Sequence, residues 1–264
     1  MFTPAEVANN VIGIGKAKAS NKPYKLFLLG ILAGMFIALA AVGANTASCT
    51  IENASAAKLV GACIFPVGLL MVLVAGSELF TGNNLIIVPV LTGDVKCSAM
   101  LKNWIIVYLG NFVGSILIAL IACYSGQFDL FGGALAATTI KVATGKATLS
   151  FGQAILKGIA CNFLVCIAVW MSFAAKSVGG KLAAIYLPIM LFVLAGFEHS
   201  IANMYYVPAG LFAAQATGTT VEGLTWGNFF INNLIPVTIG NIIGGAVLVG
   251  VMYWAIYLAD KKAD

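Results

Sequence analysis

The fold of this chain depends on the stretch Gly76-Ser77-Glu78-Leu79-Phe80-Thr81-Gly82-Asn83-Asn84, which interrupts an apolar run over residues 59–91. Glu78 is the one acidic residue of that run. An ionised group at membrane depth costs at least ~2.5–3.5 kcal/mol on insertion scales, so it generally faces a polar cavity, a partner or a pathway. We therefore expect two half-helices joined by a buried loop, with Asn83 or Asn84 capping the second half.

A second apolar run, over residues 182–212, is broken by Gly196-Phe197-Glu198-His199-Ser200. His199 is the only histidine of the chain, and an imidazole changes charge near neutral pH. The N-terminus of a half-helix carries partial positive charge and unpaired N–H donors, which suit anions. Two such termini at mid-membrane predict a donor-rich site for negative charge. Glu78 and Glu198 are interpreted first as anchors for the two loops, with a direct role in transport as the alternative.

The composition is that of an integral membrane protein. Of the 264 residues, 61% are hydrophobic and only 9% are charged, whereas a soluble domain averages about 25% charged residues. Each membrane-spanning helix needs ~20 residues, so residues 1–264 suit a single channel domain with six crossings. All 14 basic residues are lysines, and most lie at the ends of apolar runs. This pattern indicates membrane orientation and no nucleic-acid binding.

The six expected crossings are four regular runs and the two broken ones. The regular runs cover residues 26–44, 104–123, 158–175 and 234–259. Counted from a cytoplasmic N-terminus, the inner segments hold ten lysines and the outer segments four, which obeys the positive-inside rule. Both termini are then cytoplasmic, and the protein lies in the cell (inner) membrane, surrounded by lipid.

Three segments flank or connect the two repeats. Residues 1–25 carry a capping box at Thr3, Pro4 and Glu6, which predicts an amphipathic helix at the cytoplasmic membrane surface. The alternative is a plain solvated leader. Residues 124–157 are expected to be an extracellular-side connection, and residues 260–264 a cytoplasmic tail.

The chain also matches itself, with residues 26–123 as a first repeat and residues 158–259 as a second. Three motifs recur in the same order roughly 120–130 residues apart, among them Gly110-Asn111-x-x-Gly114, which returns as Gly240-Asn241-x-x-Gly244. Three crossings per repeat invert the second repeat, and such folds place their pathway near the midplane. The expected fold class is all-α, with six transmembrane helices in two inverted three-helix repeats whose second and fifth helices are broken. The glycine pairs allow close helix packing, within or between protomers.

Of three classes of function, these sequence features favour an anion channel. A small neutral-solute pore of the water or glycerol kind would expect Asn-Pro-Ala repeats, which the sequence lacks. An intramembrane enzyme would need paired catalytic groups, but the sequence has one histidine and no arginine. The six cysteines form no CxxC pair, which favours buried apolar thiols over metal or redox use. No cofactor, metal or catalytic residue is expected.

Three segments resemble the formate/nitrite transporter family. Residues 75–82 (AGSELFTG) resemble its first signature, residues 158–168 (GIACNFLVCIA) its second, and residues 196–200 (GFEHS) its central-histidine segment. The resemblance covers essentially the whole chain and is greatest to the hydrosulfide channel branch. It implies an aquaporin-like fold and a homopentamer with one pore in each protomer. It also implies passage of small inorganic or organic anions, namely hydrosulfide, formate or nitrite.

The resemblance further implies roles for individual residues. Thr81 lies on a loop that gates the inner mouth, His199 is the central donor, and Asn162 faces the same point. Lys146 attracts anions on the extracellular side. The implied constrictions are Phe80 and Val165 on the inner side and Phe65, Leu69 and Phe192 on the outer side.

A simpler interpretation of each site residue stands beside its implied role. Thr81 is also explained as a loop cap, Asn162 as an interhelical hydrogen bond, Lys146 as a solvated charge and the phenylalanines as ordinary core. Because a bare anion loses its hydration in an apolar slit, we also hypothesise that His199 passes a proton to the permeant. The permeant would then cross as a neutral acid.

Overall fold

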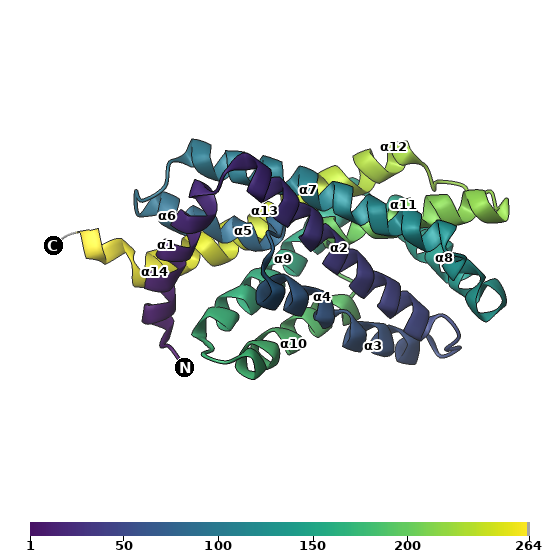
Figure 1. Ribbon diagram of the computed structural model, residues 1–264, viewed down its shortest axis with the longest axis horizontal. Coiled ribbons are helices and arrows are strands. Elements are labelled where there is room, and N and C mark those ends of the chain that lie inside the picture. The colour runs from purple at the N-terminus through teal and green to yellow at the C-terminus, as the bar shows by residue number, and fades with distance from the viewer. Residues whose placement is uncertain (263–264) are drawn as a thin grey trace.

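The computed structural model describes residues 1–262, and every regular element in this range is a helix (Figure 1). Residues 263–264, at the end of the expected tail, lie outside the described residues. Five helices are long and apolar enough to cross a membrane: Pro23–Ser48, Ala54–Gly76, Cys97–Tyr124, Phe151–Ala174 and Trp226–Tyr257. Two shorter apolar helices, Phe80–Leu91 and Val178–Leu194, lie between them in sequence. The N-terminus and the last described helices lie at the same end of an elongated bundle.

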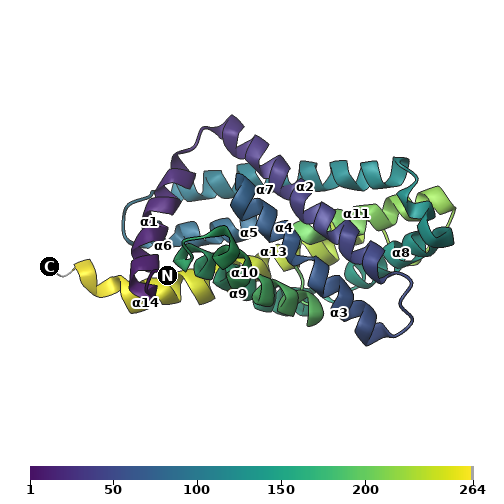
Figure 2. The same cartoon turned by 60° about the horizontal axis from the view of Figure 1, so that its bottom comes forward.

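The first helix, α1 (Pro4–Ser20), has the predicted capping box. The Thr3 hydroxyl accepts a hydrogen bond from Glu6 N at 3.3 Å, and the Glu6 carboxylate accepts one from Thr3 N at 2.7 Å. Val7 and Val11 are buried because α1 packs against α6 (Ile87–Leu91), α7 (Cys97–Tyr124) and α9 (Phe151–Ala174). Figure 2 shows α1 crossing one end of the bundle. This helix is therefore part of the packed structure.

The first helix break lies where the sequence predicts it. The chain runs through α3 (Ala54–Ile64), α4 (Pro66–Met71) and the π-helical η1 (Val72–Gly76). Gly76 has a φ of 84°, a conformation that favours glycine, and residues 77–79 are not helical. The helix restarts as α5 (Phe80–Asn83), η2 (Asn84–Ile86) and α6.

The prediction that Asn83 or Asn84 caps the second half-helix is wrong. Asn83 is the last residue of α5 and Asn84 follows it, so neither lies at the helix start. The first free N–H group, that of Phe80, donates instead to Asn111 Oδ1 on α7 at 3.0 Å. A side chain from a distant helix therefore replaces the local cap.

The second break also lies where it is predicted, between α10 (Val178–Leu194) and α11 (Ser200–Thr217). Gly196 has a φ of 71°, and residues 197–199 are not helical. His199 is the N-cap residue of α11, because its Nδ1 accepts a hydrogen bond from Ala202 N at 3.1 Å. This histidine is thus fixed by the helix that it begins.

Glycines bring two pairs of long helices into backbone contact. A Cβ on Gly34 of α2 (Pro23–Ser48) would strike the backbone of Asn111 on α7, and one on Gly114 would strike that of Ile31. In the second half, a Cβ on Gly240 of α13 (Ile235–Ile242) would strike the Ile155 carbonyl of α9. These glycines pack helices within one protomer, which was one of the two alternatives.

The last crossing is not the regular helix expected for residues 234–259. It begins earlier, as α12 (Trp226–Asn228), and two π-helical segments interrupt it: η4 (Phe229–Leu234) and η5 (Ile243–Val251). Side chains from both halves press against η5, since a Cβ on Gly245 would strike Asn162 of α9 and one on Gly250 would strike Ile87 of α6. Such π-turns are often found at functional sites. The described chain then ends with α14 (Met252–Tyr257) and η6 (Ala259–Lys262).

The connection over residues 124–157 is largely helical. It contains η3 (Gln127–Gly133) and α8 (Ala134–Ala147), which packs against α11. Lys146 lies in the last turn of α8. The segment between the two halves therefore places the Lys146 side chain beside Glu198 of the second half.

Candidate functional site

The two helix breaks meet at Thr81 and His199, which are both buried. Thr81 Oγ1 lies 2.9 Å from His199 Nε2. A neutral imidazole has one donor and one acceptor nitrogen, and Nδ1 is already the acceptor for Ala202 N. Nε2 therefore carries the proton and donates to Thr81 Oγ1. The hydroxyl hydrogen of Thr81 is then free to be offered to another acceptor at this point.

Asn162 holds the backbone of the Thr81 loop. This residue of α9 is fully buried. Its Nδ2 donates to Asn84 Oδ1 at 2.8 Å, to Asn241 O at 2.7 Å and, more weakly, to Thr81 O at 3.3 Å. Cys166 Sγ, one turn further along α9, lies 3.2 Å from the same Thr81 carbonyl. Asn162 thus contacts the backbone beside the Thr81–His199 pair, and not the Thr81 hydroxyl.

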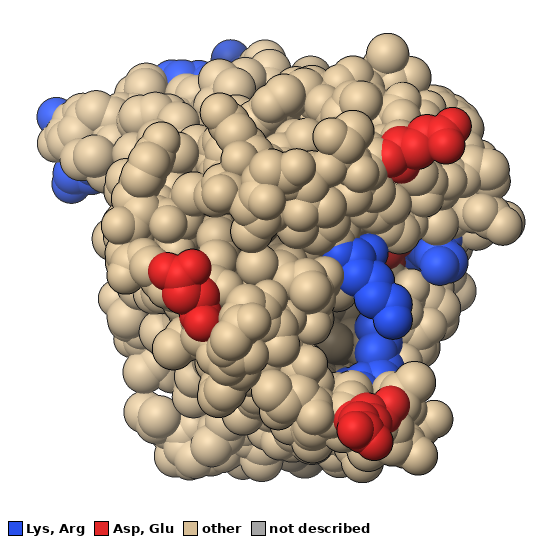
Figure 3. All heavy atoms as spheres, turned by 90° about the vertical axis from the view of Figure 1, so that its right-hand side faces the viewer, with Lys and Arg blue, Asp and Glu red and all other residues tan. Residues whose placement is uncertain are grey.

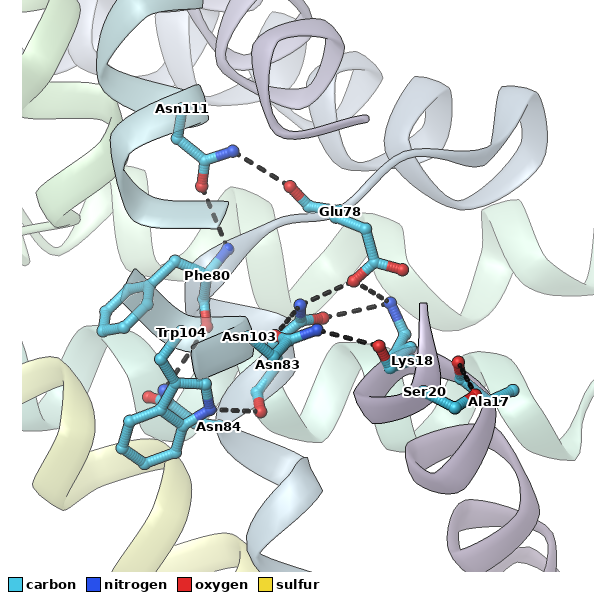
Figure 4. Close-up of polar contacts among 10 residues, drawn as sticks. All are labelled: Ala17, Lys18, Ser20, Glu78, Phe80, Asn83, Asn84, Asn103, Trp104 and Asn111. Carbon is cyan, nitrogen blue, oxygen red and sulfur yellow. Dashed lines mark hydrogen bonds and ion pairs between the residues drawn. The ribbon is translucent and has the colours of Figure 1, made fainter. Parts of the chain in front are cut away.

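One asparagine ties each break to a neighbouring long helix. Asn111 accepts from Phe80 N and donates to Glu78 O at 2.9 Å and Gly30 O at 2.8 Å (Figure 4). From the sequence, Asn111 and Asn241 were recognised only as members of the internal repeat, and their hydrogen bonds to the backbone of the breaks were not predicted. The recurrence of this asparagine in both halves was the sequence feature that could have indicated the role. Asn241 makes the corresponding bonds in the second half, to Ser200 N at 2.9 Å, Gly158 O at 2.9 Å and Glu198 O at 3.0 Å.

The carboxylate of Glu78 is paired with Lys18 of α1 (Figure 4). Lys18 Nζ lies 2.9 Å from Glu78 Oε2 and 3.0 Å from Asn83 Oδ1. Asn83 Nδ2 donates to Glu78 Oε2 at 2.6 Å and to Asn103 Oδ1 at 2.9 Å, and Asn103 Nδ2 donates to the Lys18 carbonyl at 3.1 Å. Sequence reasoning missed Lys18, because its partner lies 60 residues away in sequence.

The second half repeats this cluster around Glu198. Lys146 Nζ lies 3.0 and 3.1 Å from the two carboxylate oxygens and 5.1 Å from the centre of the Tyr206 ring. Asn203 Nδ2 donates to Glu198 Oε2 at 2.7 Å and to Asn233 Oδ1 at 2.7 Å, and Asn233 Nδ2 donates to the Lys146 carbonyl at 3.0 Å. The carboxylates of Glu78 and Glu198 therefore bind side-chain ammonium and amide groups. The backbone carbonyls of the same two residues accept hydrogen bonds from Asn111 and Asn241.

Two cavities approach the Thr81–His199 pair. The first, of about 400 Å³ and here called the Lys146 cavity, is lined by residues that include Lys58, Phe65, Lys141, Lys146, Phe192 and His199. The second, of about 380 Å³ and here called the Lys18 cavity, is lined by residues that include Lys18, Leu69, Ser77, Glu78, Gly82 and Asn83. Each cavity thus contains a lysine that is paired with a loop glutamate.

The expected constriction residues are all buried, but they lie in different surroundings. Phe65 and Phe192 meet edge to face, with ring centres 5.7 Å apart, and Phe192 stacks on His199 at 5.9 Å. Leu69 lines the Lys18 cavity, although it was expected in the outer constriction. Phe80 packs edge-on against Tyr108 at 4.9 Å. Among the described residues that line the two cavities, Phe80 and Val165 do not appear.

Comparison with known proteins identifies the family. The family model described as formate/nitrite transporter matches residues 5–255. This chain belongs to the formate/nitrite transporter family. The formate channel FocA of Escherichia coli (strain K12) is 41% identical over 275 residues, which cover 99% of this chain and 96% of FocA. A probable formate transporter of Methanothermobacter thermautotrophicus is 38% identical over 277 residues, which cover 98% of each chain.

Solved structures of the family are similar to this one. A pentameric formate channel with formate bound matches with a TM-score of 0.79 and 38% identity, over 89% of this chain and 98% of that chain. An ion channel of the family matches with a TM-score of 0.83 and 29% identity, over 95% and 98%. The family prediction is therefore confirmed, and the relatives are channels and transporters, not enzymes. The hydrosulfide branch stays a prediction, because the relatives named here are formate channels or transporters.

Proposed function

We propose that this protein is a membrane channel for formate and related monovalent weak-acid anions, with a pore in each protomer. The observation that carries the proposal is the buried Thr81–His199 pair. His199 lines the Lys146 cavity, and Gly82, next to Thr81, lines the Lys18 cavity. The proposal is also supported by relatives that are named formate channels, such as FocA of Escherichia coli. Nitrite and hydrosulfide are small monovalent anions of weak acids too, and we keep them as further permeants.

The proposed topology has six crossings in two inverted repeats, with the broken fifth crossing made by α10 and α11. Support comes from the two equivalent Lys–Glu–Asn–Asn clusters, one in each half. It also comes from the N-terminus and the last described helices, which lie at the same end of the molecule. With ten lysines on that side and four on the other, both termini are cytoplasmic and the membrane is the inner one. The Lys146 cavity then opens outward.

Dehydration is the main barrier that such a pore must lower. An anion in an apolar constriction loses hydration worth several kcal/mol or more. The lysines of the outer mouth, Lys146 together with Lys58 and Lys141, raise the concentration of anions there. At the centre the Thr81 hydroxyl, which accepts from the His199 Nε2–H, offers its own hydrogen to the anion. Movement of the Thr81 loop gates the inner mouth. We assign the apolar constrictions to Phe65, Leu69, Phe192, Phe80 and Val165, and the role of loop anchor to Glu78 and Glu198.

A proton role for His199 follows from its tautomer. Nδ1 is the one ring nitrogen that can accept a further proton, and protonation there breaks the bond from Ala202 N. The imidazolium is therefore costly and short-lived in this environment. We propose that Nδ1 takes a proton from water that enters the Lys146 cavity while an anion is adjacent, and that Nε2 gives its proton to that anion. Nδ1 then returns its proton to water and Nε2 takes one up, which restores the starting tautomer. The neutral acid then crosses the constriction, and Asn162 keeps the Thr81 backbone in place during the step.

The proposed assembly is a homopentamer. It rests on the solved relative that is pentameric and on exposed apolar side chains along the described helices, such as Ile105, Leu156 and Leu187. These side chains suit contact with lipid or with a second copy of the chain. The pore lies within each protomer because both cavities and the Thr81–His199 pair are formed by one chain.

The test is flux into liposomes that contain the purified protein. Formate, nitrite, hydrosulfide, water and glycerol are offered in turn across a pH series. We expect anion flux that rises as the pH falls, and little glycerol flux. The His199→Phe variant is expected to lose most formate flux together with its pH dependence. Fast water or glycerol flux without anion flux would favour the neutral-solute pore. Unchanged flux and pH dependence in His199→Phe would refute the proton role.

A further inference from the structure

We propose that the Lys146 cavity contains an anion-binding site of its own, formed by the side-chain amide of Asn45 and the ammonium group of Lys58. This site is separate from the Thr81–His199 pair, although both side chains line the cavity that ends at His199. The inference rests on the proposed function, because its ligand is the anion on its way to the centre. It assigns the first capture step to two residues outside the motifs.

Lys146 itself is poorly placed to hold an anion. Its ammonium group lies 3.0 and 3.1 Å from both oxygens of Glu198, so the pair is close to neutral as seen from the cavity. Lys58, Lys141 and one carboxylate, that of Glu52, line the same cavity. Neither of these lysines takes part in the ion pairs found among residues 1–262, and together they outnumber the single acid. Figure 3 looks onto this end of the molecule and shows lysine side chains gathered around one hollow. The unpaired positive charge is therefore that of Lys58 and Lys141.

Asn45 supplies an unused hydrogen-bond donor in this wall. The residue is only 6% exposed, and its Nδ2 has no hydrogen-bond partner among the described residues. Its neighbours on α2 are satisfied, since the hydroxyl groups of Thr46 and Ser48 donate to backbone carbonyls at 2.8 and 2.7 Å. Buried amide groups are nearly always paired. As placed, the Nδ2 atom is closed off from the cavity. A half-turn of the amide exchanges its two ends without a change of shape, and in that orientation Asn45 presents its N–H donors to the cavity.

The packing of α2 against α3 brings the two side chains to one wall. A Cβ on Gly61 of α3 would lie 3.4 Å from the Ala44 carbonyl and 3.7 Å from Ser48 Oγ. Ala44, which precedes Asn45, and Ser48, one turn after Ala44, therefore face Gly61. Lys58 precedes Gly61 by one helical turn and lies on the same face. Phe65 follows Gly61 by one turn and reaches Phe192 and the His199 end of the cavity.

The chemistry of this wall selects a small anion that keeps part of its water. An ammonium group and an amide N–H both donate, which suits a monovalent carboxylate or oxyanion. The cavity volume of about 400 Å³ greatly exceeds that of a three-atom anion, and each water occupies ~30 Å³ in the liquid. The anion is therefore held here before it loses its hydration, ahead of Phe65 and Phe192.

One-sided formate uptake tests the site. Protein oriented in liposomes is offered sodium formate from the Lys146-cavity side or from the Lys18-cavity side, and KM and maximal flux are measured for each direction. We expect Asn45→Leu and Lys58→Gln to raise KM from the Lys146-cavity side about three- to tenfold. In a passive channel the ratio of maximal flux to KM is the same from both sides, so the maximal flux from the Lys146-cavity side should rise together with its KM. The KM and the maximal flux measured from the other side should stay unchanged. Lys58→Arg, which keeps the charge, should restore the low KM.

Lys157→Gln is the matched control. Lys157 is close enough for its charge to act on Lys58, but it is not among the residues that line the cavity. If Lys157→Gln raises KM as much as Lys58→Gln, the effect is diffuse surface charge, and the proposed site is wrong. If it leaves KM within twofold of the wild-type value, the site is supported.

Thermal stability separates a binding role of Asn45 from a structural one. Asn45→Leu removes an unpaired buried polar group, so we expect an equal or higher Tm in detergent together with the raised KM. A lower Tm with an unchanged KM would show that Asn45 is a structural residue and would overturn the proposal. If the wild-type protein carries formate while both variants keep the wild-type KM, this inference alone fails. If the wild-type protein carries none, the proposed function fails with it.

Discussion

Asparagine side chains replace water at the two helix breaks. A broken helix leaves N–H and C=O groups that lipid cannot satisfy, and an amide is a compact group that both donates and accepts. Asn111 and Asn241 each accept from the first N–H of a restarting helix and donate to carbonyls on the other side of the break. Each break is therefore stabilised by one asparagine from a helix that is distant in sequence.

Removal of one such amide should be costly. Asn111→Leu leaves Phe80 N, Glu78 O and Gly30 O without their partner, and we expect the free energy of unfolding to fall by about 2–4 kcal/mol. The measurement is thermal or denaturant unfolding in detergent micelles. Asn232→Leu is the control, because the one bond of that side-chain amide is to Asn228 at 3.1 Å. Equal losses in the two variants would contradict the bridging role of Asn111.

The Lys18–Glu78 pair should behave as a buried ion pair. Its side chains are 24% and 7% exposed, so loss of one partner leaves an uncompensated charge. We expect Lys18→Met or Glu78→Gln alone to cost about 3 kcal/mol of stability, and the double variant to cost clearly less than the sum. Lys16→Met tests the surface counterpart, because the Lys16–Asp94 pair is 53% and 32% exposed. That variant should cost less than about 1 kcal/mol. Additive losses for Lys18 and Glu78 would show that the two groups are not coupled.

At the scale of elements, the π-helical η5 forms a notch for side chains of α9 and of the first break. Gly245 lies against Asn162, Cys166 and Asn84, and none of these contacts leaves space for a Cβ. Asn162 and Cys166 in turn contact the Thr81 carbonyl. The geometry of the last crossing is therefore transmitted to the loop that carries Thr81.

A methyl group in this notch should impair transport. Gly245→Ala is expected to displace Asn162 and the Thr81 loop, and to lower formate flux at least tenfold while the protein still folds. Gly13→Ala is the control, because a Cβ there meets nothing within 4 Å; it should preserve flux and raise stability by up to about 1 kcal/mol. Liposome flux and the detergent Tm are measured for both variants. Wild-type flux in Gly245→Ala would show that the notch does not position the loop.

Local patterns predicted some of these elements and missed others for a physical reason. Both breaks were predicted because Gly, Ser, Glu and Asn are poor material for an apolar helix, and the capping box at Thr3 was predicted because it is a local motif. The π-helical turns of the last crossing were missed because residues 234–259 read as one regular apolar run. Only side chains that are distant in sequence explain the notch at Gly245. Lys18 was missed for the same reason. Thr81 and His199 are brought together in the structure, but the roles assigned to them stay predictions.

At the scale of the whole molecule, two similar mouths face opposite ends of one short pathway. Each mouth has a lysine paired with a loop glutamate and supported by two asparagines. An anion that follows the proposed pathway from either side therefore meets one lysine–glutamate pair before it reaches the centre. Direction should then be decided by the anion and proton gradients, and not by the channel. The two mouths differ in the unpaired Asn45 donor and in the unpaired lysines of the Lys146 cavity.

The protomers of the proposed pentamer should each transport formate without help from their neighbours. Both cavities and the Thr81–His199 pair belong to one chain, so each protomer of a pentamer should conduct independently. Wild-type protein is co-expressed at known ratios with an inactive variant, His199→Phe or, if that variant retains flux, Gly245→Ala. Native mass spectrometry of the mixtures checks that the assemblies contain five chains of both kinds. Formate flux per assembly should then fall in direct proportion to the fraction of inactive chains. A pathway shared at the centre of the pentamer would instead lose flux steeply, since one inactive chain would impair the whole assembly, and that result would refute a pore within each protomer.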